Sequence, residues 1–424
     1  MARFSGVEEC KPPSKRIAKK GRAWYTVSAM KRCLCLIVYF KMEGVAMNSM
    51  IQDFIARNKD SMLQTLKELC LIPAPSHYEH ERAKYCKAWL EKIGAQGVYI
   101  DDAQNTIFPL NCESSNQITV FAAHLDTVFP DREPLPYYDD GEKIHCPGCS
   151  DDTASVVVLL FMAKFFLENH IQPKHGLMFV CDAGEEGLGN LKGMRQLFTD
   201  YEGRVAQFVT MEPGFSAIGI GAVGSHRYNV EVLTEGGHSF SAFGNNNAIE
   251  KLSKMVADIY AIDVPKIEDS KTTYNVGIIN GGTSVNTIAQ KASMLCEYRS
   301  SDADCLKIME EKFQAIFENA RTDKVQVNVE KVGDRPCSKK GINNMKLANT
   351  ACSILTQIMD IQPRFVSGST DANIPLSLGV PAIRIGVAKN ANTHRRDEWV
   401  EKDSLMLGLE YAIKLGLELK EDVV

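Results

Sequence analysis

A short apolar run that ends in two glutamates between glycines is the feature that most constrains this chain. Leu177–Cys181 has the length of a buried strand, and Gly184-Glu185-Glu186-Gly187 follows it closely. Neighbouring carboxylates repel each other, so the pair is either solvated in a turn or compensated by a strong positive charge. Because adjacent side chains point in different directions, one glutamate can hold a cation while the other handles protons.

Strand-like and helix-like segments alternate around this run. Ile118–Ala123 and Val205–Thr210 have the apolar pattern of further strands, and Ala154–Leu167 is apolar on nearly every side, as in a buried helix. Strands that alternate with helices form a parallel sheet covered on both faces. We therefore predict an α/β fold with a mostly parallel sheet and helices on both faces.

The order of segments changes between residues 221 and 332. Strand, helix, strand, strand, helix and strand patterns follow one another there, at Tyr228–Leu233, Ala248–Ile262, Thr273–Ile279, Ala292–Tyr298, Ala303–Ala320 and Val325–Val332. This is the order of a ferredoxin-like α+β domain. We predict that it is inserted into the α/β domain, which is then formed by residues 48–220 and 333–424.

Composition limits the class of partner and the compartment. The chain of 424 residues is long enough for two domains, and its net charge of -5 argues against nucleic acid as a partner. Thirteen scattered cysteines, an odd number, indicate reduced thiols in a cytoplasmic protein. Cys146-Pro-Gly-Cys149 is either a redox or zinc motif or a coincidence in a turn, and the lack of a second such pair favours coincidence.

Residues 1–47 differ from the rest of the chain. They contain ten Lys or Arg residues against three Glu, and their apolar run Cys33–Phe40 is too short to span a bilayer. We expect a disordered or dispensable extension and no membrane partner. A peripheral membrane anchor is the alternative.

Polar residues that could bind a metal follow the predicted strands or begin the helices. They are His124, Asp126, Asp151, Glu185, Glu186, Glu212 and His394. Each has a simpler explanation when taken alone: Asp151 could cap a helix, Glu212 could lie in a polar turn, and His124 could be a core imidazole. Ligands of open parallel sheets bind beyond the carboxyl ends of the strands. Imidazole and several carboxylates gathered there favour a divalent cation site.

The same residues lie in motifs that resemble those of a known family. The motifs are His124-Leu-Asp126, Gly148-Cys-Ser-Asp151-Asp152, Gly184-Glu185-Glu186-Gly187, Met211-Glu212-Pro213 and Thr393-His394-Arg-Arg-Asp-Glu398. In this order they resemble the co-catalytic zinc exopeptidases and deacylases, a family that includes carboxypeptidase G, peptidase T, acetylornithine deacetylase and succinyl-diaminopimelate desuccinylase. The run after His394 looks most like peptidase T-like proteins, whereas glutamate at position 212 is more typical of carboxypeptidases and deacylases.

The resemblance implies a role for each motif residue. One divalent ion would be bound by His124 and Glu212 and another by Glu186 and His394, while Asp151 would bridge them. Asp126 would hydrogen-bond the second nitrogen of His124, and Glu185 would be the general base that acts on water. The two ions would be zinc, although cobalt or manganese fits similar ligands.

The inserted domain carries further matches to the family. In Gly236-Gly-His238-Ser239, the histidine resembles the lid histidine that reaches the partner subunit's site. Asn286 and Arg299 resemble the lid asparagine and the arginine that binds a substrate carboxylate, and Thr370 lies in a segment like a substrate-pocket loop. The resemblance thus implies a homodimer formed through the lid.

We predict a metal-dependent amide hydrolase of the exopeptidase type, acting on short peptides or N-acyl amino acids. One alternative is an N-acyl-amino-acid deacylase of the acetylornithine or succinyl-diaminopimelate type. A second is a non-catalytic binding protein on the same fold, and a third is a thiol-dependent protein that uses Cys146 and Cys149.

Overall fold

The computed structural model describes residues 23–113 and 115–421, with side chains from residue 46 onward. The chain divides into two units, Met1–Asp53 and Phe54–Val424. Residues 1–22 of the expected extension lie outside the described residues, and residues 23–47 belong to helix α1 (Ala23–Cys70). The sequence predicts this helix only from residue 51. Within the described ranges, no helix combines the length and the apolar character needed to cross a membrane.

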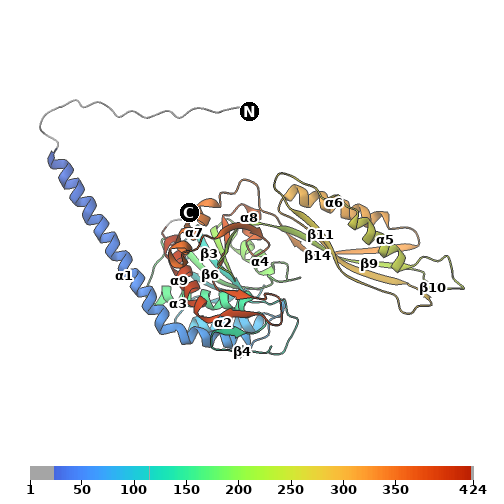
Figure 1. The fold of residues 1–424 in the computed structure, drawn as a ribbon, viewed down its shortest axis with the longest axis horizontal. Helices are drawn as coiled ribbons and strands as arrows, with labels where there is room; N and C mark the ends of the chain where they lie inside the picture. Colours follow the sequence, from blue (N-terminus) through green and yellow to red (C-terminus); the bar gives the residue numbers. More distant parts are fainter. Residues whose placement is uncertain (1–22, 114, 422–424) are drawn as a thin grey trace, which may run out of the picture. The chain divides into compact units, whose positions relative to one another are not determined.

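The second unit contains an eight-stranded sheet whose central strands are parallel (Figure 1). Its strand order is β1 (Tyr99–Ile100), β2 (Thr106–Leu110), β6 (Gly176–Asp182), β3 (Ile118–His124), β7 (Val205–Glu212), β16 (Ala382–Gly386), β8 (Ala217–Ala222) and β15 (Arg364–Gly368). β6, β3, β7 and β16 run parallel, while β2 against β6 and β16 against β8 are antiparallel. The predicted mostly parallel α/β fold is confirmed, and the carboxyl ends of β6, β3 and β7 share one edge.

Helices cover both faces of this sheet because its central strands are apolar on both sides. Every residue of β3 and β6 is buried. On one face, Phe179 packs edge-on against Phe166 of α3 (Ser155–Glu168). On the other, Val180 belongs to a core with Met194 of α4 (Lys192–Asp200). Outside the inserted segment, further α-helices of this unit are α2 (His80–Lys92), α7 (Met345–Met359), α8 (Asn373–Leu378) and α9 (Lys402–Leu419).

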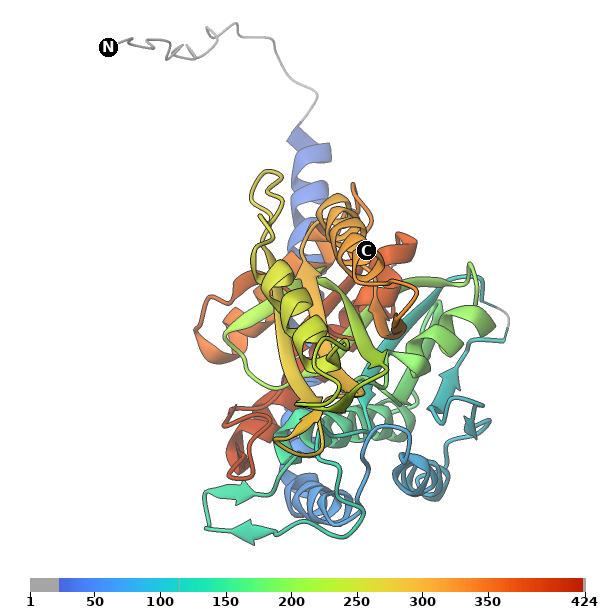
Figure 2. The same ribbon diagram turned by 90° about the vertical axis from the view of Figure 1, so that its right-hand side faces the viewer.

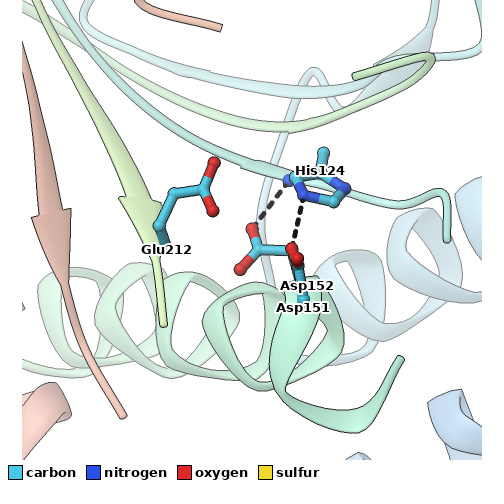
Figure 3. A group of neighbouring side chains, drawn as sticks. All are labelled: His124, Asp151, Asp152 and Glu212. Carbon is cyan, nitrogen blue, oxygen red and sulfur yellow. Dashed lines mark hydrogen bonds and ion pairs between the residues drawn. The ribbon is translucent and has the colours of Figure 1, made fainter. Parts of the chain in front are cut away.

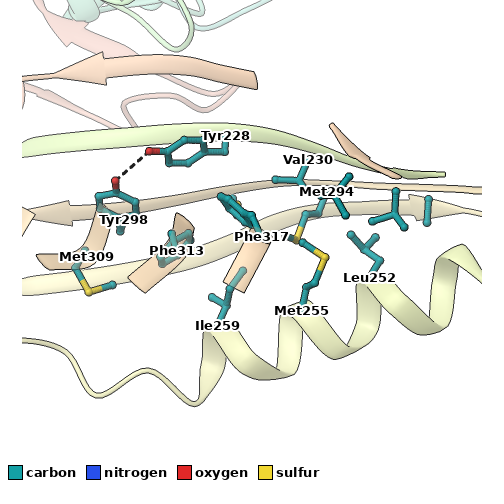
Figure 4. Close-up of a cluster of buried hydrophobic side chains, with 14 of the residues drawn as sticks. Tyr228, Val230, Leu252, Met255, Ile259, Met294, Tyr298, Met309, Phe313 and Phe317 are labelled. Atoms are coloured by element: carbon teal, nitrogen blue, oxygen red, sulfur yellow. Dashed lines mark hydrogen bonds between the residues drawn. The ribbon is translucent and has the colours of Figure 1, made fainter. Parts of the chain in front are cut away.

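The inserted segment forms a four-stranded antiparallel sheet, here called the lid sheet. Its order is β11 (Thr272–Gly281), β13 (Lys291–Ser300), β9 (Gly224–Thr234) and β14 (Val325–Arg335), the ferredoxin-like order that the sequence predicts. α5 (Ala248–Tyr260) and α6 (Ala303–Asn319) cover one face in both views (Figures 1 and 2). Each begins at a capping side chain, Asn247 and Asp302. Figure 4 shows the apolar core between this face and the helices.

A separate four-stranded sheet of short strands brings part of the last third of the chain beside the loop that carries Asp151. Its order is β17 (Asn390–Ala391), β18 (Trp399–Glu401), β5 (Lys143–His145) and β4 (Tyr138–Asp139). The sequence does not predict it, because strands of two or three residues show no periodicity. A further pair, β10 (Gly237–His238) and β12 (Thr287–Ile288), belongs to the inserted segment.

Candidate metal centre

Asp151 lies between two histidines from distant parts of the chain. Its Oδ1 atom is 3.1 Å from Nε2 of His124, and its Oδ2 atom is 3.1 Å from Nε2 of His394. His124 ends strand β3, whereas His394 lies in the loop between β17 and β18. Nε2 of His394 is also 2.9 Å from Oε1 of Glu186. A carboxylate that offers one oxygen to each of two histidine sites has the arrangement of a bridging ligand.

Two groups of potential ligand atoms share Asp151. The first contains His124, Asp151, Asp152 and Glu212, all buried (Figure 3), and the second contains Asp151, Glu186 and His394. Asp151 and Asp152 are joined by a cis peptide bond. Oδ2 of Asp152 accepts a hydrogen bond from the backbone N–H of His124 at 3.0 Å. Asp152 thus fixes the end of β3 from inside the site, a role that the sequence does not suggest.

The electrostatics of both groups indicate a need for positive charge. Burial and the neighbouring charge of Asp151 raise the pKa of Glu212 well above its usual range. Burial also raises the pKa of Asp152, and Glu212 adds to this effect. Hydrogen bonds to Asp151 and Glu186 raise the pKa of His394 to about 10. Protons on these groups offset the crowded carboxylates, and a divalent cation does the same when it binds, so the donor set fits divalent metal.

Asp126 positions the turn that carries the paired glutamates. Oδ1 accepts hydrogen bonds from the N–H groups of Gly184 and Glu185, at 3.1 and 3.0 Å, and Oδ2 accepts one from Glu186 at 3.0 Å. Ser76 Oγ donates a fourth at 2.6 Å. Four donors on one carboxylate hold this turn rigidly beside β3.

The contact between Asp126 and His124 differs from the expected one. Nδ1 of His124 is 3.0 Å from the backbone oxygen of Asp126 and 3.6 Å from its carboxylate Oδ1. The backbone oxygen therefore makes the closer contact with the second ring nitrogen, while the carboxylate lies just beyond. Burial alone would raise the pKa of Asp126, but His124 and the other donors bring it down to about 2. The Asp126 side chain is therefore an anion, and it contacts both His124 and the turn that carries Glu185 and Glu186.

Glu185 has a partner that the sequence analysis missed. Nη1 of Arg335, at the end of β14, is 3.0 Å from Oε1 of Glu185, and Nη2 donates to the backbone oxygen of the same residue. Both side chains are buried. Burial raises the pKa of Glu185 to about 8, against the opposing charge of Arg335. In the sequence, Arg335 is marked only by the proline that follows it, Pro336, at the point where the chain leaves the inserted domain. No other sequence feature pointed to Arg335 as a residue of the site.

Glu398 holds the loop that carries Asp151. Its Oε1 atom accepts hydrogen bonds from the backbone N–H groups of Ser150 and Asp151, at 2.9 and 3.0 Å, and Oε2 accepts one from Gly148 at 3.0 Å. Gly148 has φ 76°, and a Cβ there would lie 2.5 Å from Cγ2 of Thr127. The sequence places Glu398 in a motif but does not predict this contact.

The structure shows the local partners of the predicted substrate residues, and none of these partners belongs to the two ligand groups. His238 and Asn286 are neighbours in the inserted segment, where the N–H of Ser239 donates to the oxygen of Asn286 at 3.0 Å. Arg299 forms an ion pair with Glu297 on the lid sheet. Thr370 is half-buried, and its N–H donates to Asn373. Their roles toward a substrate stay predictions.

Comparison with known proteins supports what the geometry indicates. A Bacillus subtilis protein, YqjE, is 24% identical over 385 residues, 84% of this chain and 98% of that protein. The succinyl-diaminopimelate desuccinylase of Corynebacterium glutamicum is 23% identical and aligns with 83% of this chain and 95% of its own. These alignments extend over nearly the full length of both relatives.

Solved structures share the fold. A Staphylococcus aureus tripeptidase superposes with a TM-score of 0.68 at 21% identity, over 84% of this chain and 97% of its own. Human carnosine dipeptidase 1 gives 0.68 at 14% identity, over 88% and 99%. The model of the family described as peptidase family M20/M25/M40 matches residues 120–417, well over half of the chain. That match includes both ligand groups, and the chain belongs to this hydrolase family.

Proposed function

We propose that the protein hydrolyses an amide bond in short peptides or N-acyl amino acids, with two divalent ions, zinc in the cell, bound around Asp151. The observation that carries this proposal is the position of Asp151. Its two oxygens lie 3.1 Å from the Nε2 atoms of His124 and His394, as a ligand shared by two cations requires. Glu212 completes the first group and Glu186 the second. Two such ions acidify a water molecule and polarise the scissile carbonyl.

Glu185 is the proposed general base. It precedes Glu186 on a turn that Asp126 fixes through three backbone N–H groups, so its carboxylate lies beside the ligands without being needed as one. It accepts the proton of the attacking water and passes it to the leaving nitrogen. The charge of Arg335 opposes the effect of burial and favours the anionic form of this carboxylate. One of its N–H groups donates to Oε1 and another to the backbone oxygen of Glu185, so it also orients the residue.

Deacylation is the second candidate reaction. It is favoured by the relative named succinyl-diaminopimelate desuccinylase and by the glutamate at position 212. Peptide hydrolysis is favoured by the structural neighbours named tripeptidase and dipeptidase. The same residues would perform both reactions, because each breaks an amide with metal-activated water.

A substrate screen with controlled metal content tests the proposed function. The full chain is stripped with a chelator, reloaded with zinc, cobalt or manganese, and assayed on dipeptides, tripeptides and N-acetyl amino acids. We expect hydrolysis that is lost on stripping and restored by metal. A requirement for a free α-carboxylate would support the role of Arg299, and one for a free amino end would indicate an aminopeptidase. Metal binding without hydrolysis of any substrate would contradict the proposal and favour a binding protein.

We propose further that two chains associate through the lid in the cytoplasm. β11 is an edge strand of the lid sheet, and α5 lies alongside it. Together they expose Ile249, Tyr260 and Ile279, which are 41%, 54% and 53% accessible. An exposed edge strand flanked by apolar side chains is suited to pairing with a second copy. Ten cysteines of the described residues are free thiols, which supports a reducing compartment.

Light scattering of the full chain tests the association. We expect the mass of two chains for the wild type and a shift toward one chain for Ile279→Lys, because a charge cannot be buried in that interface without a partner. Lys254→Glu, a charge change at an exposed position of α5, is the control and should leave the mass unchanged. A wild-type mass of one chain would contradict the proposal.

A further inference from the structure

The two cysteines of the Cys146-Pro-Gly-Cys149 motif do not pair with each other. Sγ of Cys149 donates to the backbone oxygen of Ile144 at 3.5 Å. Sγ of Cys146 lies 3.9 Å from the backbone oxygen of Cys70, and the thiols of Cys146 and Cys70 are in hydrogen-bonding contact. Cys70 ends helix α1, 76 residues before Cys146. The thiol pair therefore joins two distant segments instead of the two ends of one turn.

This thiol pair lies close to the surface. Cys70 and Cys146 are buried, but Leu71, the residue after Cys70, is 38% accessible. Tyr137 is half-buried beside the pair. Burial raises the pKa of Tyr137 to about 12, and the neighbouring thiols add to this effect. A molecule as small as hydrogen peroxide therefore has only a short path to the two sulfur atoms.

A buried guanidinium group lies beside the same thiols. Arg82 is 3% accessible, and its Nε and Nη1 atoms donate to the backbone oxygens of Ile72 and Leu125 at 2.8 and 2.9 Å. Among the described residues, no carboxylate lies within ion-pair distance of it. Burial lowers the pKa of Arg82, and the anionic forms of Cys70 and Cys146 oppose this effect. A buried cation without a carboxylate partner is costly, so it favours a thiolate next to it.

The two thiols are not equivalent. The hydrogen bond from Cys70, together with the charge of Arg82, holds the pKa of Cys146 below its usual range. The same contact and burial raise the pKa of Cys70 well above it. Cys146 is therefore the nucleophile of the pair, and Cys70 is a protonated thiol beside it. Oxidant-sensitive sites often combine a low-pKa cysteine with a second thiol in this way.

We propose that Cys70 and Cys146 form a peroxide-reactive pair, which closes a reversible disulfide between the end of α1 and the loop that carries Asp151. The thiolate of Cys146 attacks hydrogen peroxide, the O–O bond breaks, and a sulfenic acid and hydroxide form. The sulfur of Cys70 then attacks the sulfur of Cys146, the S–S bond forms, and the leaving hydroxide takes the proton of Cys70. In sum, two thiols are oxidised, and one peroxide is reduced to two water molecules.

The modified residue is connected to the candidate metal centre through Glu398. The backbone N–H of Cys146 donates to the backbone oxygen of Glu398 at 3.2 Å, and the carboxylate of Glu398 accepts from the N–H of Asp151 at 3.0 Å. The disulfide would therefore fix one end of the loop that Glu398 holds. The inference does not depend on the proposed hydrolysis, because oxidation of the thiols needs neither metal nor substrate.

Peptide mapping of the full wild-type chain tests the pair. The reduced protein is exposed to increasing hydrogen peroxide, free thiols are blocked by alkylation, and linked peptides are identified by mass spectrometry. We expect a Cys70–Cys146 link that a dithiol reductant reverses. Cys112 and Cys296 are internal controls, because burial raises their pKa values to about 11 and about 12. They should be oxidised at least about tenfold more slowly, since the thiolate is the reactive form.

Three serine variants test the role of each thiol. Cys70→Ser removes the second thiol, so the sulfenic acid on Cys146 should persist and be trapped by a cyclic 1,3-dione. Cys146→Ser removes the nucleophile, and Cys70 should then stay reduced. Cys149→Ser is the matched control, which keeps the pair and should form the disulfide as the wild type does.

A Cys146–Cys149 link in the wild type would overturn the proposal. The absence of a Cys70–Cys146 link at the peroxide dose that oxidises Cys112 or Cys296 would also overturn it. A sulfenic acid on Cys70 in Cys146→Ser would contradict the assigned roles. Mapping of the wild type needs no substitution, so a folding defect in a variant cannot decide the result.

Discussion

Glu185→Gln is expected to keep metal bound and to lower kcat by about 100- to 10,000-fold, the usual contribution of a general base. Glutamine retains an oxygen that can accept the hydrogen bond from Nη1 of Arg335, so the turn should stay folded. It cannot take a proton from water at neutral pH. The backbone N–H bonds from Glu185 and Glu186 to Asp126 are independent of this side chain and should persist.

The measurement pairs steady-state kinetics with metal analysis of the same preparation. Glu202→Gln changes an exposed glutamate elsewhere in the same unit and should behave as the wild type in both. Wild-type kcat in Glu185→Gln would show that another group accepts the proton. Loss of metal together with activity would instead make Glu185 a ligand, since His124, Glu185 and Glu186 also form a group of suitable geometry.

Asp151→Asn is expected to have the largest effect on metal affinity. Each carboxylate oxygen faces a different histidine at 3.1 Å, and an asparagine offers one oxygen and one N–H₂ group that cannot bind a cation. The metal affinity should fall by more than the roughly 10- to 100-fold that is usual when a residue that hydrogen-bonds a metal ligand is removed. Activity should fall with it, because both ligand groups contain Asp151.

Thermal unfolding with and without zinc gives the readout. A ligand that binds only the folded state raises Tm, so zinc should raise the Tm of the wild type and of Asp102→Asn, a change at an exposed aspartate. Asp151→Asn should show little or no zinc-dependent rise. A full rise in the Asp151 variant would exclude a bridging role, whatever its activity.

The gathering of the candidate ligands at one edge of the sheet could be predicted because the sequence indicates where each strand ends. His124 and Glu212 are the last residues of β3 and β7, and Glu186 follows β6 after a short turn. Parallel strands bring such residues to one edge regardless of what lies between them. His394 was predictable only through its motif, since it follows no long strand and reaches Asp151 and Glu186 from the loop between β17 and β18.

Contacts between distant segments could not be predicted in the same way. Arg335 meets Glu185 from the end of the inserted domain, 150 residues away, and Glu398 holds the Asp151 loop from 247 residues away. Glu398 lies in a motif and Arg335 precedes a proline, but neither local pattern predicts which distant group the side chain contacts. The start of α1 at Ala23 was not predicted either. Residues 1–47 are basic, unlike the rest of the chain, and were therefore expected to form an extension outside the fold.

By itself, the sequence determined which residues lie at the strand ends, the ferredoxin-like order of the lid and the paired glutamates between glycines, because periodicity and strand termini are local properties. Only the tertiary structure decided which oxygen of Asp151 faces which histidine, how Asp126 holds Glu185 and Glu186, and that the thiol of Cys146 meets Cys70 and not Cys149. The physical reason is that charge balance and hydrogen-bond satisfaction depend on which buried groups meet, and packing alone brings them together.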